Sequence, residues 1–152
     1  MRTFTNLEQL QQAAGEELGT SDWLLIDQAR INRFADATDD HQWIHVDVAR
    51  AADGPFGGTI AHGHLTLSLL PRFAWEIYTL ENVKTAINYG LNRVRFIHPV
   101  RVGARIRSTA TLISVTEVPG GAQLVISQRV DVEVDGTPKP ACIAETISRV
   151  LF

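Results

Sequence analysis

One short stretch of the chain places acidic and imidazole side chains among bulky apolar ones, and within it Asp40 and His45 lie five residues apart. Aspartate has a reference pKa of about 3.9 and histidine of about 6.5, so near neutral pH the first is ionised and the second can gain or lose a proton. If the two side chains converge, they can hold one water molecule and share proton removal and proton delivery. The alternative is that Asp40 caps a helix and His45 is a packed core histidine.

Convergence depends on where the preceding helix ends. Apolar residues in 31–38 recur at helical spacing, and Asp27 is placed to cap that helix. In an unbroken helix Asp40 and His45 would point about 140° apart, so the helix must end near Asp40 and the chain must turn. Asp39 is expected to be solvated at the helix end, His41 to be exposed, and Asp47 to cap a short helix over 48–52. None of the three is expected to have a catalytic role.

A second candidate group is the backbone N–H of Gly63, at the start of a strongly apolar helix expected from about 63 to 78 with a kink or break at Pro71. The first N–H groups of a helix lack internal partners, and that end of the helix is positive. Such a donor could polarise a thioester carbonyl and stabilise the enolate that forms when water attacks the β-carbon. The alternative is that Gly63 only permits a tight turn into the helix.

Two further patterns have weaker chemical readings. His62 and His64 form a His-x-His pair, but no third ligand at suggestive spacing is apparent, so we expect no metal and a supporting role for His62 in the turn. Arg93 and Arg95 alternate with apolar residues on an expected strand and so share one face. That face could bind phosphate groups, because guanidinium is a fork-shaped donor, or it could simply be solvated or ion-paired.

The elements that must position these groups divide the chain in two. The first half has helical patterns, including a helical appendage over 1–19 with capping-box spacing between Thr5 and Glu8. The second half has strand patterns near 84–97, 103–117, 122–134 and 140–151, separated by Gly- and Pro-containing turns. The expected fold is a single α+β domain over 1–152, an antiparallel sheet wrapped round a long buried central helix. The edges of such a sheet need cover, which favours a homodimer.

Composition limits the classes of function. The 152 residues carry a net charge of −3 with a pI near 5.9, which does not fit a nucleic-acid binder. The single cysteine, Cys142, cannot form an internal disulfide and indicates a reducing compartment. No apolar run approaches the ~20 residues of a membrane span, and the first residues do not resemble a secretory signal. We therefore expect a cytoplasmic protein without a membrane partner.

Together, three stretches resemble the MaoC-like dehydratases, also called (R)-specific enoyl-CoA hydratases, a family with the hot-dog fold. The family signature Asp-x-Asn-Pro-(Leu/Ile)-His corresponds to Asp40–His45 here, the apolar-His-Gly helix start to Ile60–Gly63, and Phe-x-x-Pro-Val-x-x-Gly to Phe96–Gly103. The resemblance covers roughly 20–150. It implies a catalytic water held by Asp40 and His45, an oxyanion site at the Gly63 N–H, and a homodimer or larger assembly with the substrate near the subunit interface.

The resemblance also implies a reaction. In the family, syn addition of water to a trans-2-enoyl-CoA gives the (3R)-3-hydroxyacyl-CoA, the reverse reaction is dehydration, and no cofactor or metal takes part. The substrate would be a thioester of CoA or of acyl-carrier protein. This chain departs from the signature where Gln42 and Trp43 replace Asn-Pro, which puts substrate length in doubt more than reaction class. Both residues are substrate-binding candidates, with Arg93 and Arg95. The alternatives are a hot-dog thioesterase and a non-catalytic acyl-CoA-binding subunit.

Overall fold

Four long antiparallel strands make up the second half of the chain: β5 (Thr85–Phe96), β6 (Arg105–Val118), β7 (Gly121–Val134) and β8 (Thr137–Leu151). The computed structural model describes residues 1–152, and the strands lie within a few residues of their predicted positions. The hairpin between β7 and β8 turns at Asp135 and Gly136, both with positive φ (50° and 74°). A two-residue turn of this hand matches the twist of the flanking strands.

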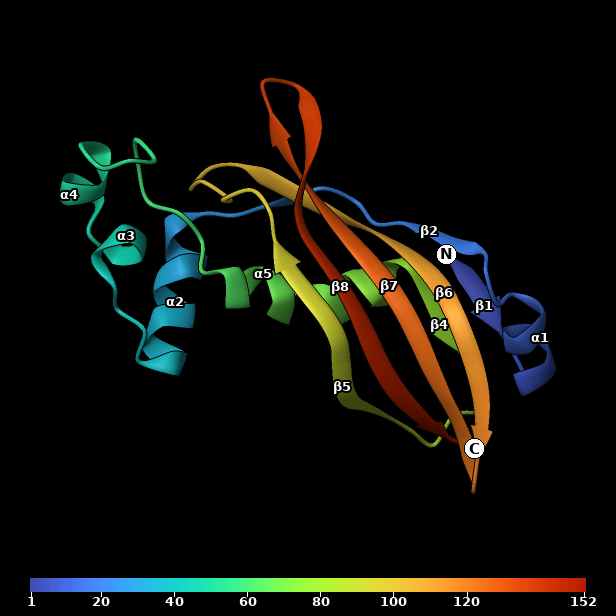
Figure 1. The fold of residues 1–152 in the computed structure, drawn as a ribbon. Helices are drawn as coiled ribbons and strands as arrows, with labels where there is room; N and C mark the ends of the chain where they lie inside the picture. Colours follow the sequence, from blue (N-terminus) through green and yellow to red (C-terminus); the bar gives the residue numbers. More distant parts are fainter.

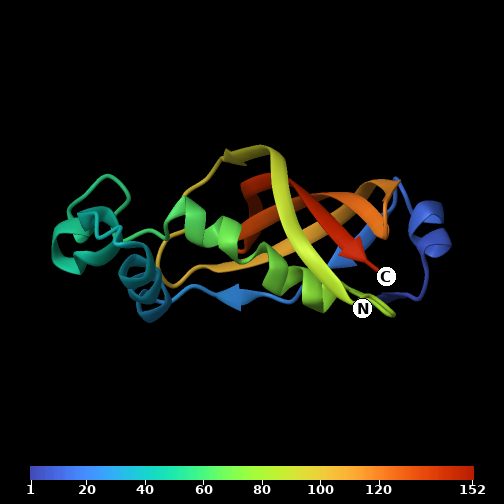
Figure 2. The ribbon, with the colours of Figure 1, turned by 90° about the horizontal axis from the view of Figure 1, so that it is seen from below.

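With the short strand β2 (Glu17–Thr20), the strands form one curved sheet in the order β2-β6-β7-β8-β5, and the short strand β3 (Leu24–Leu25) pairs with β6 as well. Burial alternates along much of β6 and β7, and on β6 the residues Ile106, Ser108, Ala110 and Leu112 are all fully buried. That period of two gives the sheet one inner face and one outer face. The inner face curves around the central helix (Figures 1 and 2), so the predicted α+β arrangement is confirmed.

The central helix consists of α5 (Gly63–Ser68) and α6 (Leu70–Ile77), separated at Leu69. Pro71 lies at the start of α6, where its missing N–H costs least, and this explains the break that the sequence predicted. Leu65 and Phe73 are among its buried residues, and Phe73 has no exposed surface. The buried face of the helix packs on the sheet, whereas His64, Ser68 and Trp75 on its other face are exposed.

Two separate groups of buried apolar residues stabilise the two ends of this helix. The first surrounds Leu65 and Phe73 and includes Ile31 of α2 (Gln28–Thr38) and residues of β6, β7 and β8. The second lies around Ile77 at the far end and includes Phe4 and Leu10 from the N-terminal segment. The first group therefore covers the helix from Leu65 to Phe73, and the second covers only its C-terminal end at Ile77.

The N-terminal segment differs from its prediction as a helical appendage. It holds β1 (Arg2–Phe4), the short helix α1 (Leu7–Gln12) and β2 (Glu17–Thr20), and β1 pairs with β4 (Tyr78–Leu80) after the central helix. Asn6 caps α1 in place of Thr5, and the chain leaves the helix before Gly15, whose φ is 92°. Leu18 has helical spacing in the sequence, but in the structure it is buried in β2.

Three helices form a lobe at the other end of the molecule: α2 (Gln28–Thr38), α3 (Trp43–Val46) and α4 (Val48–Ala52) (Figure 1). The Asp27 and Asp47 side chains accept hydrogen bonds from the backbone N–H groups of Arg30 and Arg50, which confirms both predicted caps. The lobe joins the N-terminal end of α5 through residues 53–62. None of the helices in the chain has both the length and the hydropathy that crossing a membrane requires.

Candidate active site

The chain reverses direction immediately after α2, as convergence of Asp40 and His45 requires. The helix ends at Thr38, and Asp39 follows in the left-handed conformation with φ 59°. Aspartate tolerates this conformation better than most residues. The exposed Asp40 comes next, and His45 follows within α3, where it is buried. The turn brings the two side chains to the same place.

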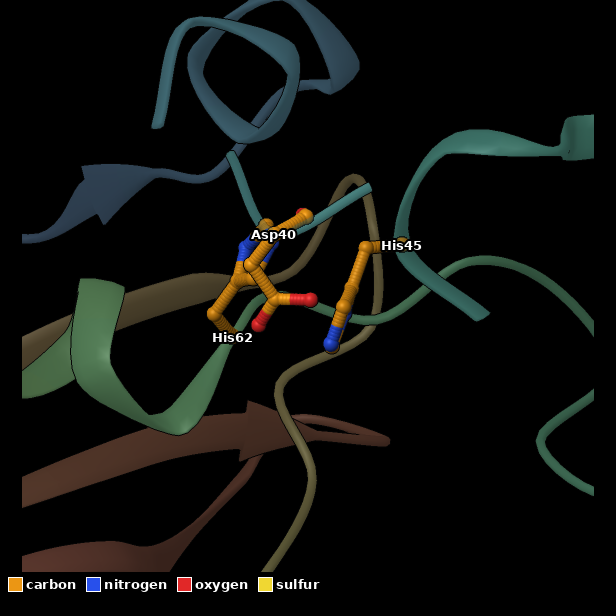
Figure 3. Close-up of side chains that lie close together, drawn as sticks. All are labelled: Asp40, His45 and His62. Carbon is orange, nitrogen blue, oxygen red and sulfur yellow. The ribbon is translucent and has the colours of Figure 1, made fainter. Parts of the chain in front are cut away.

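Asp40, His45 and His62 form one cluster at the N-terminal end of the central helix. A carboxylate oxygen of Asp40 and a ring nitrogen from each histidine all lie within 4.8 Å of one another. Figure 3 shows the Asp40 carboxylate and the His45 ring directed into the same space. The carboxylate remains exposed while both imidazoles are buried, so the cluster has one polar side open to solvent. The predicted meeting of Asp40 and His45 is therefore present in the structure.

The ring of His45 is held in one orientation by its Nδ1–H, which donates to the carbonyl oxygen of Ile60 at 2.7 Å. A carbonyl can only accept, so this hydrogen bond assigns the proton of the neutral ring to Nδ1 and leaves Nε2 with a free lone pair. Burial lowers the pKa of His45 below its ordinary value, and the adjacent His62 contributes in the same direction. His45 is therefore suited to accept a proton through Nε2 at neutral pH.

His62 contacts both members of the pair. Its Nε2–H donates to the backbone carbonyl of Asp40 at 2.9 Å, and its ring stacks on that of His45 with centroids 3.8 Å apart and planes 24° apart. Phe34 of α2 packs against its other side at 4.9 Å. The predicted supporting role for His62 thus has a definite geometry: it fixes the turn that carries Asp40 and backs the ring of His45.

The same cluster supplies the third potential metal ligand that the sequence did not suggest. His62 meets His45 and Asp40, whereas His64 is exposed and its ring lies edge-on to Phe96 at 5.8 Å. A bound Zn²⁺ would lie about 2.0–2.1 Å from each imidazole nitrogen, close to the plane of each ring. One nitrogen of each ring is already hydrogen-bonded to a backbone carbonyl, His45 Nδ1 to Ile60 and His62 Nε2 to Asp40, so each neutral ring keeps a single lone pair. The absence of a metal from the reaction stays a prediction.

Gly63 follows His62 directly and is the first residue of α5, so its backbone N–H has no acceptor within the helix. The Phe96 ring covers this glycine: a Cβ on residue 63 would lie 3.1 Å from two of the ring carbons. Glycine therefore allows close packing here, beside the Asp40 and His45 cluster. The arrangement is compatible with the predicted oxyanion site.

Gln42 and Trp43, the departures from the family signature, lie at the start of α3. Gln42 is exposed and makes no side-chain hydrogen bond as the N-cap of α3. The Trp43 ring packs within the lobe, with the Arg50 guanidinium 4.3 Å from its centroid and Gly54 against its edge. Trp43 thus stabilises the α3–α4 turn, and a substrate contact for either residue stays a prediction.

The structure does not bring Arg93 and Arg95 to the cluster. Val94 packs against the core and Phe96 covers Gly63, so both face inward, and the two arginines point from the outer face of the sheet. Arg93 lies 3.9 Å from Glu145, and Arg95 donates to the backbone carbonyl of Val94. These contacts favour the solvated or ion-paired alternative, and phosphate binding by either arginine stays a prediction.

The sequence interpretation missed two residues that shape the site, Gln28 and Thr59. Gln28 donates a hydrogen bond to the backbone of His45, and Thr59 donates one to Gln28. Phe96 was identified only as part of the family signature. Gln28 carries no local signal beyond its place after the cap Asp27, because its partners lie 17 and 31 residues further along the chain.

One protein family and several curated relatives match most of the chain. The family described as "MaoC like domain" matches residues 9–134. The 3-hydroxyacyl-thioester dehydratase Z of Mycobacterium tuberculosis is 57% identical over 150 residues, which cover 98% of each chain. Nodulation protein N of Rhizobium leguminosarum is 44% identical over 97% of this chain and 92% of its own.

Solved structures support the fold. The R-hydratase PhaJ1 from Pseudomonas aeruginosa superposes with a TM-score of 0.72 at 22% identity, covering 91% of this chain and 81% of that one. At this identity the likeness establishes the hot-dog fold alone. The family match and the close relatives go further, and they show that this chain belongs to the MaoC-like dehydratases and is a hydro-lyase.

Proposed function

We propose that this protein catalyses the reversible syn addition of water to a trans-2-enoyl-CoA, giving the (3R)-3-hydroxyacyl-CoA. The observation that carries the proposal is the convergence of the Asp40 carboxylate with a buried His45 whose Nε2 is free to accept a proton. The dehydratase relative at 57% identity, which acts on a 3-hydroxyacyl thioester by its name, supports the same reaction class. Stereochemistry and carrier are the finer parts of the proposal.

In this mechanism the Asp40 carboxylate and His45 Nε2 hold one water molecule between them. His45 removes a proton as the water oxygen bonds to C3 of the enoyl group, and the C2=C3 electrons shift to form an enolate. The Gly63 N–H donates to the enolate oxygen and stabilises its charge. The His45 imidazolium then returns the proton to C2 on the same face, so that water adds across the double bond and the enzyme is regenerated. No cofactor or metal is required.

The primary test is incubation of the protein with crotonyl-CoA. Loss of enoyl absorbance without release of free thiol supports hydration, whereas thiol release would indicate a thioesterase. Binding without turnover would indicate a non-catalytic acyl-CoA-binding subunit. Repeating the assay with the enoyl group on acyl-carrier protein distinguishes the two carriers by their kcat/KM.

Two pairs of variants test the roles of the catalytic residues. Asp40→Asn and His45→Gln should each lower kcat by about 10²–10⁴-fold, the usual contribution of a positioned acid or base. Asp39→Asn and His41→Gln make the same chemical changes at exposed neighbours and should retain activity. Near-native activity of either Asp40→Asn or His45→Gln would refute the assignment.

A homodimer is part of the same proposal. β5 is an edge strand of the sheet, and its side chains Ile87, Tyr89 and Leu91 are 47–56% exposed. A groove of about 850 Å³ separates β5 from α6, where Trp75 is 75% exposed. A long apolar edge of this kind needs cover, which a second copy pairing through β5 would provide.

Light scattering tests the dimer. Leu91→Lys on β5 should reduce the mass toward that of a monomer. The matched control is Ile113→Lys, at a 45% exposed apolar position of β6, and it should leave the mass unchanged. A cytoplasmic location completes the proposal, since a lone buried thiol such as Cys142 is typical of reducing compartments.

A further inference from the structure

We propose that Gln28 is a positioning residue for catalysis, which together with Thr59 fixes both the backbone and the ring of His45. The inference rests on the proposed function, in which His45 transfers the proton. Gln28 is the first residue of α2 and lies outside the family signature. Its side chain reaches from α2 to α3 and to the segment that precedes α5, so it connects all three parts of the chain that build the site.

Every hydrogen-bonding group of the Gln28 amide has a partner. Its Nε2 donates to the backbone carbonyl of His45 at 2.8 Å and to Asn32 Oδ1 at 2.9 Å. Its Oε1 accepts from the hydroxyl of Thr59 at 2.5 Å. An amide flip would turn Oε1 toward the His45 carbonyl, where two acceptors would meet, so the network assigns the orientation.

Thr59 carries this connection to the ring of His45. Thr59 is 1% exposed and immediately precedes Ile60, whose carbonyl accepts the His45 Nδ1–H at 2.7 Å. The backbone N–H of Ile60 in turn donates to the carbonyl of Ile44 at 3.0 Å, next to His45. The Ile60 carbonyl, which accepts from the His45 ring, and the His45 backbone are thus both connected to the same Gln28 amide.

The segment around Ile60 is also hydrogen-bonded to the chain that precedes β6. The Thr59 carbonyl accepts from the N–H of Val102 at 2.9 Å, and the N–H of Ala61 donates to the carbonyl of Val100 at 2.8 Å. Ile60 is therefore held on both sides by a segment that leads into β6. Since the His45 proton sits on Nδ1 only while Ile60 accepts it, this bracing keeps Nε2 unprotonated and directed toward Asp40.

Catalytic groups must be held within about 0.5 Å of their productive positions. A displacement of about 1 Å can cost 10²-fold in rate. Loss of the Gln28 connection should therefore lower kcat while substrate affinity changes little, because the polar atoms of the Gln28 amide are already engaged by Asn32, His45 and Thr59. A residue that only stabilised the contact between α2 and α3 would lower the melting temperature and leave kcat of the folded enzyme unchanged.

The experiment uses near-isosteric variants in the full-length protein. Gln28→Met and Thr59→Val remove the hydrogen bonds while largely retaining volume, and Thr59→Ser restores the hydroxyl. We expect about a 10-fold lower kcat with unchanged KM for the first two, by the displacement argument, and recovery in Thr59→Ser. The double variant should be no worse than the worse single variant, because both changes break one network. Asn32→Ala removes only the exposed partner of the same amide and should behave as wild type.

A second readout does not depend on turnover. Imidazole ¹⁵N NMR of the wild type should place the His45 proton on Nδ1, and Gln28→Met or Thr59→Val should populate the Nε2–H tautomer. The proposal is overturned if both variants keep wild-type kcat and tautomer, or if they lower only the melting temperature. If His45→Gln keeps full activity, the proposed function itself fails, whatever the tautomer result. If His45→Gln is inactive and the Gln28 variants are normal, only the bracing role fails. Should Gln28→Met not fold, the Thr59→Val and Thr59→Ser pair decides the question.

Discussion

Replacing Gly63 with alanine tests whether the start of the central helix takes part in catalysis. The new Cβ would lie 3.1 Å from Cγ and Cδ2 of Phe96 and 3.2 Å from Cδ1. Carbon atoms in favourable contact are about 3.5–4.0 Å apart, so the ring or the helix start must move by about 0.3–0.9 Å. Overpacking costs about 1–3 kcal/mol in general. The Phe96 ring is 47% exposed and can yield toward solvent, so we expect the lower end of that range.

Stability and activity should therefore respond differently. Alanine is preferred over glycine in helix interiors by about 0.8–1.0 kcal/mol, and at Gly63, the first residue of α5, we expect a smaller gain that offsets part of the packing cost. The melting temperature of Gly63→Ala should stay close to that of the wild type. Complete loss of an oxyanion donor costs about 10²–10³-fold in kcat, and a displaced donor should cost about 10-fold.

The assay is steady-state hydration of crotonyl-CoA beside thermal unfolding. Phe96→Leu gives the new methyl group room, so the double variant Gly63→Ala/Phe96→Leu should be faster than Gly63→Ala alone. Phe96→Leu by itself controls for loss of the ring. Unchanged kcat in Gly63→Ala would refute the oxyanion role, and a loss that Phe96→Leu does not relieve would refute the steric reasoning.

Three other predictions follow from buried groups. Burial lowers the pKa of His45, so the acid limb of kcat/KM should lie below pH 6.5. Below that pH the unfolded chain binds this proton more readily than the folded one, so stability should fall with falling pH, and less so in His45→Gln. Glutamine at position 62 retains a donor for the Asp40 carbonyl, whereas phenylalanine retains only a ring that can stack on His45. If the hydrogen bond dominates, kcat should be higher in His62→Gln than in His62→Phe. Burial raises the pKa of Cys142 to about 11, so iodoacetamide should label it at pH 8 only after unfolding, as mass spectrometry can measure.

Features that depend on local sequence were predicted well. Strand patterns separated by Gly- and Pro-containing turns predicted the four long strands. Asp27 and Asp47 cap the helices that they were predicted to cap. Helical geometry alone required the helix to end near Asp40 and the chain to turn there. Asp39, in the left-handed conformation, provides this turn. The N-terminal segment was harder because its short elements take their stability from distant partners, such as β4 for β1. Local spacing alone made residues up to Leu18 look helical.

The site was predictable in its reacting groups and not in their supports. Asp40, His45 and Gly63 were identified from side-chain chemistry, helix geometry and the family signature. The stacking of His62 on His45 and the Gln28 network join residues 17 or more positions apart in sequence, which periodicity cannot reveal. Arg93 and Arg95 were correctly placed on one face, but only the fold shows that it is the outer face of the sheet.

The separation of the apolar interior into two groups has a consequence for engineering. The group around Ile77, Phe4 and Leu10 belongs to the end of the molecule where both termini lie, and the catalytic cluster belongs to the other end (Figures 1 and 2). An affinity tag, fluorophore or fusion partner attached to either terminus would sit remote from the reacting groups. Repacking the far interior for greater heat resistance should likewise leave turnover intact, so that robustness and specificity can be optimised in separate libraries.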